Sequence, residues 1–327
     1  MKRAAAAGAA AILAAAALLV PLPLVVISPG AALSVPERVE LGRDPDPVSG
    51  QLLLTTVALS QPTAAGALEA WIDGDDEVFR QRDVIPPGID PEEYTETQRQ
   101  LFRESSRVAA AVGLRAAGLE VGVSGEGAQV SGVLPGSPAE GRLRPRDVVT
   151  ALDDRAIALA SDLVAAVSRR AAGDEVTLTV RRGERDLRIT VTLAQLGELG
   201  RPGLGVTVGT VGLDFSLPFP VEVRQGSIGG PSAGLMTALT VYDLADPGDL
   251  TRGRAVAGTG TIDLDGRVGP VGGVRQKVDA AEAAAASVFL VPAEELDQAR
   301  DAAGDDLEVV GVATLDDAIA ALARPDR

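Results

Sequence analysis

The chain opens on an uncharged apolar run. Lys2 and Arg3 are followed by 24 residues, Ala4–Ile27, without one charged side chain. An α-helix of that length spans about 36 Å, enough to cross a hydrocarbon core of about 30 Å. We therefore expect residues 1–28 to form a transmembrane anchor, with its N-terminus in the cytoplasm because the two cations precede it. The alternative is a signal peptide that is cleaved near the small residues Gly30–Ala32.

Residues 29–118 are punctuated by Pro and Gly, and we expect a linker that carries one strand and one helix. The β-branched and apolar residues of Gln51–Ser60 predict the strand. Asp90 followed by Pro91 predicts the start of the helix, since Asp is a favoured N-cap and Pro a favoured first residue. The helix is expected to run toward Leu114. With either an anchor or a signal peptide, the bulk of the chain lies outside the cytoplasm. With the anchor, the chain is a single-pass protein of the cell membrane, which is what we expect.

A compact β-rich unit is predicted for residues 119–195. Its pattern is one of short apolar alternations separated by Gly, Pro and Asp turns. Two alternating runs around Arg182-Gly183 predict a hairpin. Strands are predicted at Val130–Val133, Asp147–Leu152, Glu175–Arg181 and Asp186–Leu193. A helix is predicted at Ser161–Arg170, and the capping box Ser137-Pro138-Ala139-Glu140 predicts the start of a short helix.

Strands and helices alternate over residues 200–327, which predicts a layered α/β domain. The whole chain is therefore expected to be an α/β (α+β) multidomain protein with a transmembrane helix, a β-rich domain and an α/β domain. The helices predicted in the last domain are Ser232–Tyr242, Val274–Ala286, Glu294–Ala303 and Leu315–Leu322, and its strands are Val221–Val223, Ala255–Leu264, Val288–Val291 and Leu307–Val312.

Composition removes several classes of function. The formal net charge of the 327 residues is -16, which disfavours nucleic acid as a partner. Aromatic residues make up only 2%, so the chain offers no platform for stacking bases. It has no cysteine and no histidine, which excludes disulfides, imidazole metal ligands and every Ser–His or Cys–His pair. We expect no cofactor and no metal, and a hydrolase of this composition needs a carboxylate, a lysine or a terminal amine as its base.

The densest motif is GSIGGPSAG at Gly226–Gly234. Pro231 fixes φ just before a predicted helix, so Ser232 would stand where free N–H groups and the helix dipole stabilise an oxyanion. A plain N-cap and a Gly-rich phosphate loop are the alternatives. Gly230, Ser232 and Gly234 also match the nucleophile elbow of α/β-hydrolases, but that site requires a histidine. No Walker A motif is present in the sequence.

Lys277 is one of only two lysines, the other being Lys2; the rest of the 30 cationic residues are arginine. It follows Val274 by three residues and precedes Ala281 by four, which places it on the apolar stripe of a predicted helix. Burial there favours the neutral amine, the form that a general base needs. The alternative is a lysine that snorkels along the helix edge.

The segment VSGVLPGSPAEGRLRPRDVVTALDDRAI, Val130–Ile157, resembles a PDZ domain. Arg146 stands before Asp147 where bacterial members usually have glycine, and Asp153-Asp154 replaces their usual Asn-Gly turn. The resemblance implies a domain that presents substrate or controls access to a catalytic site. A spacer that only holds the next domain is the alternative.

A second resemblance covers about Gly203–Leu322. GGPSAG at Gly229–Gly234 and GTGTIDLDGRVGPVGGVRQK at Gly258–Lys277 are similar to the proteolytic domain of Lon-type serine–lysine proteases. With the anchor and the PDZ unit, the whole chain resembles the membrane-anchored PDZ–Lon-like proteases of bacteria. The resemblance implies Ser232 as nucleophile, Lys277 as general base, Thr259 as a polar partner near the dyad, and Gly230, Ala233 and Gly234 as supporting residues.

The implied activity is that of a serine endopeptidase that cleaves exposed or unfolded segments of extracytoplasmic proteins. Independence of ATP is expected because the chain has no Walker A lysine. Protein or peptide substrates and the membrane are the expected partners, and a homo-oligomer is compatible with the sequence. The rival functions are a catalytically silent PDZ scaffold and a phosphoryl-transfer enzyme on the same general fold.

Overall fold

The structure is a computed structural model that describes residues 20–73, 76–86, 88–196 and 200–324. The chain divides into two compact units. One is continuous, Val121–Ser216, and the other combines the residues up to Glu120 with those from Leu217 onward. Most of the segment expected to be a linker, residues 29–118, is therefore an integral part of the unit that holds the C-terminal α/β layers.

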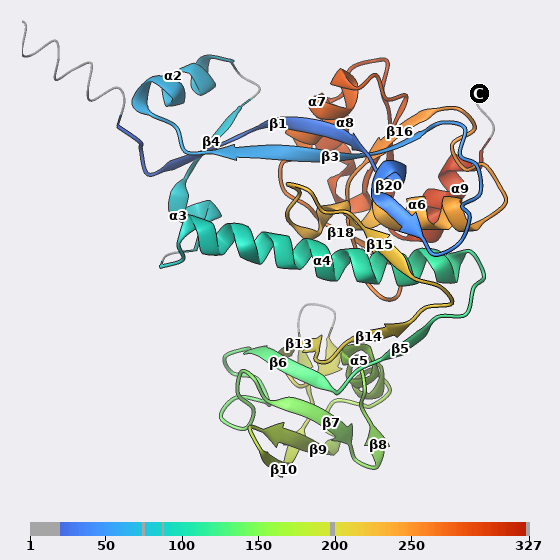
Figure 1. The fold of residues 1–327 in the computed structure, drawn as a ribbon. Coiled ribbons are helices and arrows are strands. Elements are labelled where there is room, and N and C mark those ends of the chain that lie inside the picture. Colours follow the sequence, from blue (N-terminus) through green and yellow to red (C-terminus); the bar gives the residue numbers. More distant parts are fainter. Residues whose placement is uncertain (1–19, 74–75, 87, 197–199, 325–327) are drawn as a thin grey trace, which may run out of the picture. The chain divides into compact units, whose positions relative to one another are not determined.

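A mixed sheet of six strands forms the centre of this first unit, in the order β20-β19-β16-β3-β1-β4. Four neighbouring strands are parallel, β1 is antiparallel to β3, and β4 is antiparallel to β1. Figure 1 shows that β1 and β3 extend beyond the other strands as a long antiparallel pair, whose far end carries β4. The strands are β1 (Leu24–Ser34), β3 (Gln51–Ser60), β4 (Glu77–Arg80), β16 (Ala255–Gly258), β19 (Val288–Pro292) and β20 (Glu308–Val312).

β1 corrects part of the expected anchor. Leu24–Ile27 were expected at the end of a transmembrane helix, but they pair with β4 residue by residue. The run of β-branched residues Val25-Val26-Ile27 favours a strand. No helix in the described ranges is long and apolar enough to cross a membrane. The rest of the predicted anchor, residues 1–19, lies outside the described residues.

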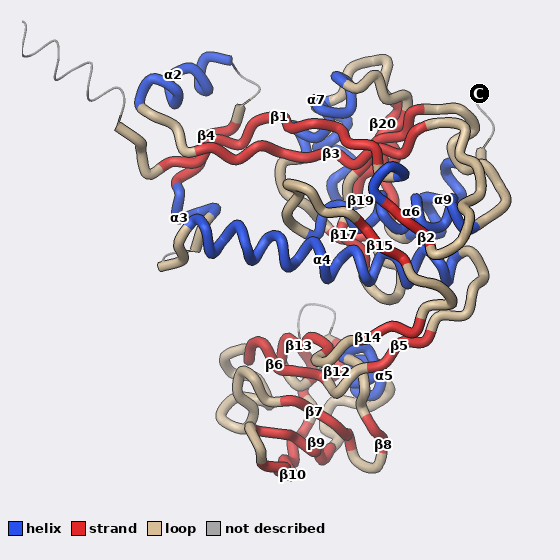
Figure 2. The backbone as a smooth tube through the Cα atoms, in the orientation of Figure 1, coloured by secondary structure: helices blue, strands red, loops and turns tan. Residues whose placement is uncertain are grey.

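Helices cover both faces of the sheet (Figures 1 and 2). α7 (Val274–Ala283) and α8 (Leu296–Ala302) pack on one face over a core that includes Leu53, Ala257 and Phe289. α6 (Gly234–Ala245) and α9 (Leu315–Leu322) lie on the other, and the long helix α4 (Pro91–Ala116) packs against α6.

The start of α4 is confirmed: the side chain of Asp90 accepts a hydrogen bond of 2.8 Å from the N–H of Glu92. Gly113 lets α4 approach α6 closely, since a Cβ there would lie 2.5 Å from the carbonyl oxygen of Ala238. The smaller elements of the first unit are η1 (Pro36–Arg38), β2 (Val39–Leu41), α2 (Ala64–Asp73), α3 (Gln81–Val84), β15 (Val221–Val223), η2 (Pro231–Ala233), β17 (Thr261–Ile262), β18 (Val268–Gly269) and η3 (Ala293–Glu295).

The second unit is a β-rich domain in which α5 (Ala160–Ser168) lies beside a sheet of order β10-β9-β7-β6-β13, to which β8 adds on β7. The prediction of a short helix starting at Ser137 is wrong, because this segment forms turns. Its core is aliphatic and includes Val149, Leu178 and Val191, all fully buried. The predicted hairpin is confirmed in register, because Arg185 pairs with Arg182. The strands are β5 (Gly122–Ser124), β6 (Ala128–Val133), β7 (Val148–Leu152), β8 (Arg155–Ala156), β9 (Glu175–Arg182), β10 (Arg185–Thr192), β11 (Ala194–Leu196), β12 (Arg201–Gly203), β13 (Val206–Thr210) and β14 (Asp214–Ser216).

At two positions where this unit departs from the PDZ pattern, the backbone adopts a left-handed conformation. Arg146 has φ 73° and Asp153 has φ 52°, in the left-handed region that favours glycine. The residue next to Arg146, Asp147, is 1% exposed and accepts two hydrogen bonds from the guanidinium of Arg182, at 2.7 and 2.6 Å. Burial disfavours its carboxylate, but hydrogen bonds from Arg182 and from the N–H of Arg144 outweigh burial and lower the pKa of Asp147. This anchored carboxylate holds the turn at Arg146.

Candidate active site

Ser232 lies in the short 3-10 turn η2, which leads directly into α6. Gly230 precedes it with φ 81°, a conformation that L side chains rarely adopt, and donates its N–H to the carbonyl of Gln98 at 2.8 Å. The carbonyl of Ser232 accepts the N–H of Gly260 at 2.9 Å and the hydroxyl of Thr259 at 3.3 Å. The backbone of Ser232 is therefore fixed at a helix start, as the Gly-Pro-Ser sequence predicted.

The residues around Ser232 are small because α4 and β17 press against this turn. A Cβ on Gly234 would lie 2.9 Å from Oγ of Ser105 and 3.0 Å from the backbone nitrogen of Ile262. Ala233 is buried, and the hydroxyl of Ser105 donates to the carbonyl of Pro231 at 3.1 Å. Gly230, Ala233 and Gly234 thus have structural reasons to be small, whatever the chemistry of the site.

Lys277 lies on the buried stripe of α7, which confirms the helical pattern seen in the sequence. It is 3% exposed, and Val274 and Val278 beside it are buried as well. Its ammonium donates a hydrogen bond of 3.1 Å to Oγ1 of Thr259, which is itself fully buried. Burial lowers the pKa of Lys277 to about 8, against the opposing attraction of the Glu295 carboxylate.

Glu295 lies in the turn η3 that follows β19. Both of its carboxylate oxygens accept the N–H of Val271, at 3.0 and 3.2 Å. Burial raises the pKa of Glu295, whereas the hydrogen bond from Val271 and the charge of Lys277 lower it. Glu295 is not among the site residues predicted from the sequence. The order of strands could have indicated it: Thr259 follows β16 and Glu295 follows β19, two parallel neighbours. The carboxyl ends of neighbouring parallel strands meet at one edge of a sheet, so residues that follow them lie close together.

The three expected residues are brought together by a short chain of hydrogen bonds. Lys277 donates to Thr259, and Thr259 donates to the carbonyl of Ser232. In the part of the chain that the structure describes, no hydrogen bond joins the Ser232 hydroxyl directly to the Lys277 amine. Ser232 and Lys277 nevertheless line one cavity of about 610 Å³. Hydrogen bonds between catalytic groups are often loose before substrate binds, so this arrangement suits a nucleophile and its base.

Part of the wall of the cavity comes from segments to which the sequence assigned no role in the site. Ile27 of β1, Val57 and Leu59 of β3, and Tyr94 and Gln98 of α4 line it. These residues were missed because they were assigned to the anchor and the linker. No local pattern marks them, since they reach the cavity only through the pairing of β1 with β3 and the packing of α4.

Two family models match the chain. Residues 110–193 match the model of the PDZ domain, and residues 220–324 match that of the Lon protease (S16) C-terminal proteolytic domain. Ser232, Thr259 and Lys277 all lie within the second match. No match is found among curated proteins.

The solved structures similar to the chain include PDZ domains of two bacterial proteins. That of an SdrC-like protein from Listeria monocytogenes is 24% identical with a TM-score of 0.25, over 25% of this chain and 87% of that one. The corresponding domain from Listeria innocua is 23% identical with a TM-score of 0.24, over 25% and 92%. A solution structure from Geobacillus thermodenitrificans is 34% identical with a TM-score of 0.23, over 25% and 95%.

Proposed function

Because the chain carries a PDZ domain and a Lon-type serine protease domain, the combination that defines PDZ–Lon-like proteases, we propose that it is an ATP-independent endopeptidase whose nucleophile is Ser232 and whose base is Lys277. One observation carries the proposal: a buried lysine with a pKa of about 8 lines the same cavity as a serine at a helix start. A chain without histidine has few other groups that can accept a proton near neutral pH.

The geometry suits acyl transfer. The neutral amine of Lys277 takes the proton of the Ser232 hydroxyl as its oxygen attacks the peptide carbonyl. The N–H of Ser232 is the donor proposed for the developing oxyanion, since the N–H of Gly234 donates to the carbonyl of Pro231 and that of Leu235 to the carbonyl of Gly260. The ammonium then protonates the leaving amine, and water hydrolyses the acyl-enzyme with Lys277 again as base. Thr259 is the positioning residue, since its hydroxyl oxygen holds Nζ of Lys277.

We assign the substrates to extracytoplasmic proteins with exposed or unfolded segments, held near the membrane by the N-terminal apolar run. The uncharged stretch after Lys2 and Arg3 supports this topology, and the absence of a Walker A motif supports independence of ATP. The PDZ domain is proposed to bind peptide or protein segments and present them.

The proposal is tested with the full chain in detergent and unfolded casein as substrate. We expect casein to be cut into peptides without nucleotide, and the rate to stay the same when ATP and Mg²⁺ are added. Acceleration by ATP would contradict the ATP-independent assignment. No cleavage of casein or of a peptide library, with PDZ-dependent peptide binding retained, would instead identify a silent PDZ scaffold.

Replacing Thr259 by valine is expected to lower kcat on the order of 10- to 100-fold with little change in KM, because Nζ of Lys277 loses its acceptor while the buried volume stays similar. Thr259→Ser keeps the hydroxyl and is the matched control, expected to retain most activity. The measurement is hydrolysis of a short peptide that does not need the PDZ domain. Equal loss in both variants would mean that Thr259 matters for packing alone.

A further inference from the structure

The uncharged N-terminal run enters the first unit at one defined place. The N–H of Leu22 donates to the carbonyl of Pro62 at 2.9 Å, and the side chain of Gln61 donates to the carbonyl of Leu22 at 3.0 Å. Pro21 and Thr63 form an isolated bridge. α2 begins at Ala64, immediately after these contacts. The point where the apolar run joins the described chain is thus bonded to the three residues that lead into α2.

The three most exposed large hydrophobic side chains among the described residues lie at this same place. Trp71 is 78% exposed, Ile72 is 71% exposed and Leu68 is more than half exposed, as is Val20 nearby. Leu68, Trp71 and Ile72 are spaced i, i+3 and i+4, so they form one stripe of α2, whose opposite side buries Ala70. The edge strand β4 beside α2 carries the partly exposed Val78 and Phe79, whose side chains point to opposite faces of the sheet. We call the residues Val20, Leu68, Trp71 and Ile72 the apolar end surface.

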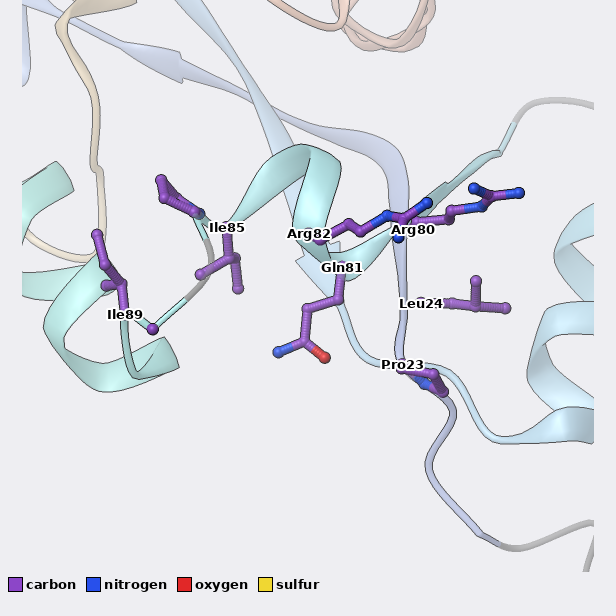
Figure 3. Close-up of a pocket in the computed structure, with 9 residues that line it drawn as sticks. Pro23, Leu24, Arg80, Gln81, Arg82, Ile85 and Ile89 are labelled. Atoms are coloured by element: carbon purple, nitrogen blue, oxygen red, sulfur yellow. The ribbon is translucent and has the colours of Figure 1, made fainter.

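Two arginines lie next to this surface. Arg80 ends β4 and Arg82 lies in α3, and both line a cavity whose other walls include Pro23, Leu24 and Ile85 (Figure 3). Arg82 has a long contact of 3.8 Å with Asp83 in an exposed setting. Within the described ranges no carboxylate pairs with Arg80. An apolar wall beside a guanidinium suits an amphiphile with an anionic group, since guanidinium binds phosphate oxygens well.

We infer that the apolar end surface lies in the interfacial region of a phospholipid bilayer, with Trp71 at the level of the headgroups and Arg80 and Arg82 against their phosphates. The inference rests on the proposed membrane anchoring, because the apolar run enters the unit at the start of α2. Apolar insertion drives the contact: the chain's net charge of -16 opposes simple attraction to an anionic surface. Trp favours such a boundary, because its rings are apolar and its N–H is polar.

Docking would also define where substrates are cut. Ile27 lines the candidate active site and follows Val20 by seven residues. Seven residues span at most about 25 Å even when fully extended. The wall of the cavity at Ile27 therefore lies within about 25 Å of Val20, where the apolar run joins the unit. Segments of protein substrates close to the bilayer surface are the ones within its reach.

Trp71 is the only tryptophan of the chain, so its fluorescence reports on this surface alone. The full chain is reconstituted into phosphatidylcholine vesicles, with and without bromine on the acyl chains, and floated on a density gradient. We expect the vesicle-bound protein to emit at shorter wavelength than the protein unfolded in denaturant, to be shielded from acrylamide, and to lose most of its emission in brominated lipid. Leu68→Ser combined with Ile72→Ser should still float and should lose most of the bromine quenching.

The matched control moves the single tryptophan to α4, as Trp71→Phe with Leu101→Trp, where the partly exposed side chain is expected to stay unquenched by bromine. Vesicle-bound protein whose Trp71 remains open to acrylamide and unquenched by bromine would overturn the inference while leaving the anchor intact. Trp71 shielded from acrylamide but unquenched by bromine would also overturn it, and would indicate a second copy of the chain on this surface. Protein that fails to float would refute the anchor and the docking together, whereas casein cleavage tests the protease assignment separately.

Discussion

Lys277→Arg will abolish peptide hydrolysis while the fold is retained. Arginine keeps the positive charge but does not deprotonate, so it cannot take the proton of Ser232. We expect kcat/KM to fall on the order of 10³-fold or more, and Lys277→Met to be equally inactive. Wild-type activity should rise with pH through about 8, because burial lowers the pKa of Lys277 to about 8 and only the neutral amine is a base. Peptide hydrolysis across pH, with chemistry rate-limiting, is the measurement.

The burial of Lys277 also affects the stability of the folded chain. The pKa of Lys277 is lowered from 10.5 to about 8, so between these values the unfolded chain holds a proton that the folded chain has released. Stability therefore rises with pH across this window and is lowest below pH 8, where the buried ammonium costs about 3 kcal/mol. Lys277→Met should raise the thermal midpoint of the first unit at pH 7 by calorimetry. Full activity of Lys277→Arg would refute the serine–lysine dyad, whatever the stability result.

Ser232→Ala is expected to reduce peptide hydrolysis on the order of 10³-fold or more, because the acyl-enzyme can no longer form. The chain offers a matched control, since Ser227 lines the same cavity five residues earlier but lies in the loop before the helix start. Ser227→Ala should keep most of the activity. Mass spectrometry after exposure to a serine-reactive phosphonate should find the adduct on Ser232 in the wild type and none in Ser232→Ala. Equal activity of the two alanine variants would show that the nucleophile is another group.

The N-terminal segment shows where local patterns mislead. An uncharged run of 24 residues predicts a membrane helix from hydropathy alone, yet its last four residues, Leu24–Ile27, form a strand. Hydropathy alone does not distinguish a lipid-facing helix from a strand buried in a sheet. The β-branched residues are a weaker signal, and here they favoured the strand. The segment Asp73–Gly88 is acidic and ends in Pro and Gly, a pattern typical of a loop, yet it contains β4 and α3. β4 forms by pairing with β1.

What the sequence determined by itself is the local part of the site. The φ preferences of Gly and Pro make Gly230-Pro231-Ser232 a helix start, and the spacing of Lys277 from Val274 places Lys277 on a buried stripe. Each of these two features depends only on residues close together in the sequence. Only the tertiary structure decided how these parts meet. β3, at the other end of the sequence, completes the sheet beside β16, and the parallel strands β16 and β19 bring Thr259 and Glu295 to Lys277. Contacts between distant segments depend on the summed packing of whole elements, which no short window of the sequence contains.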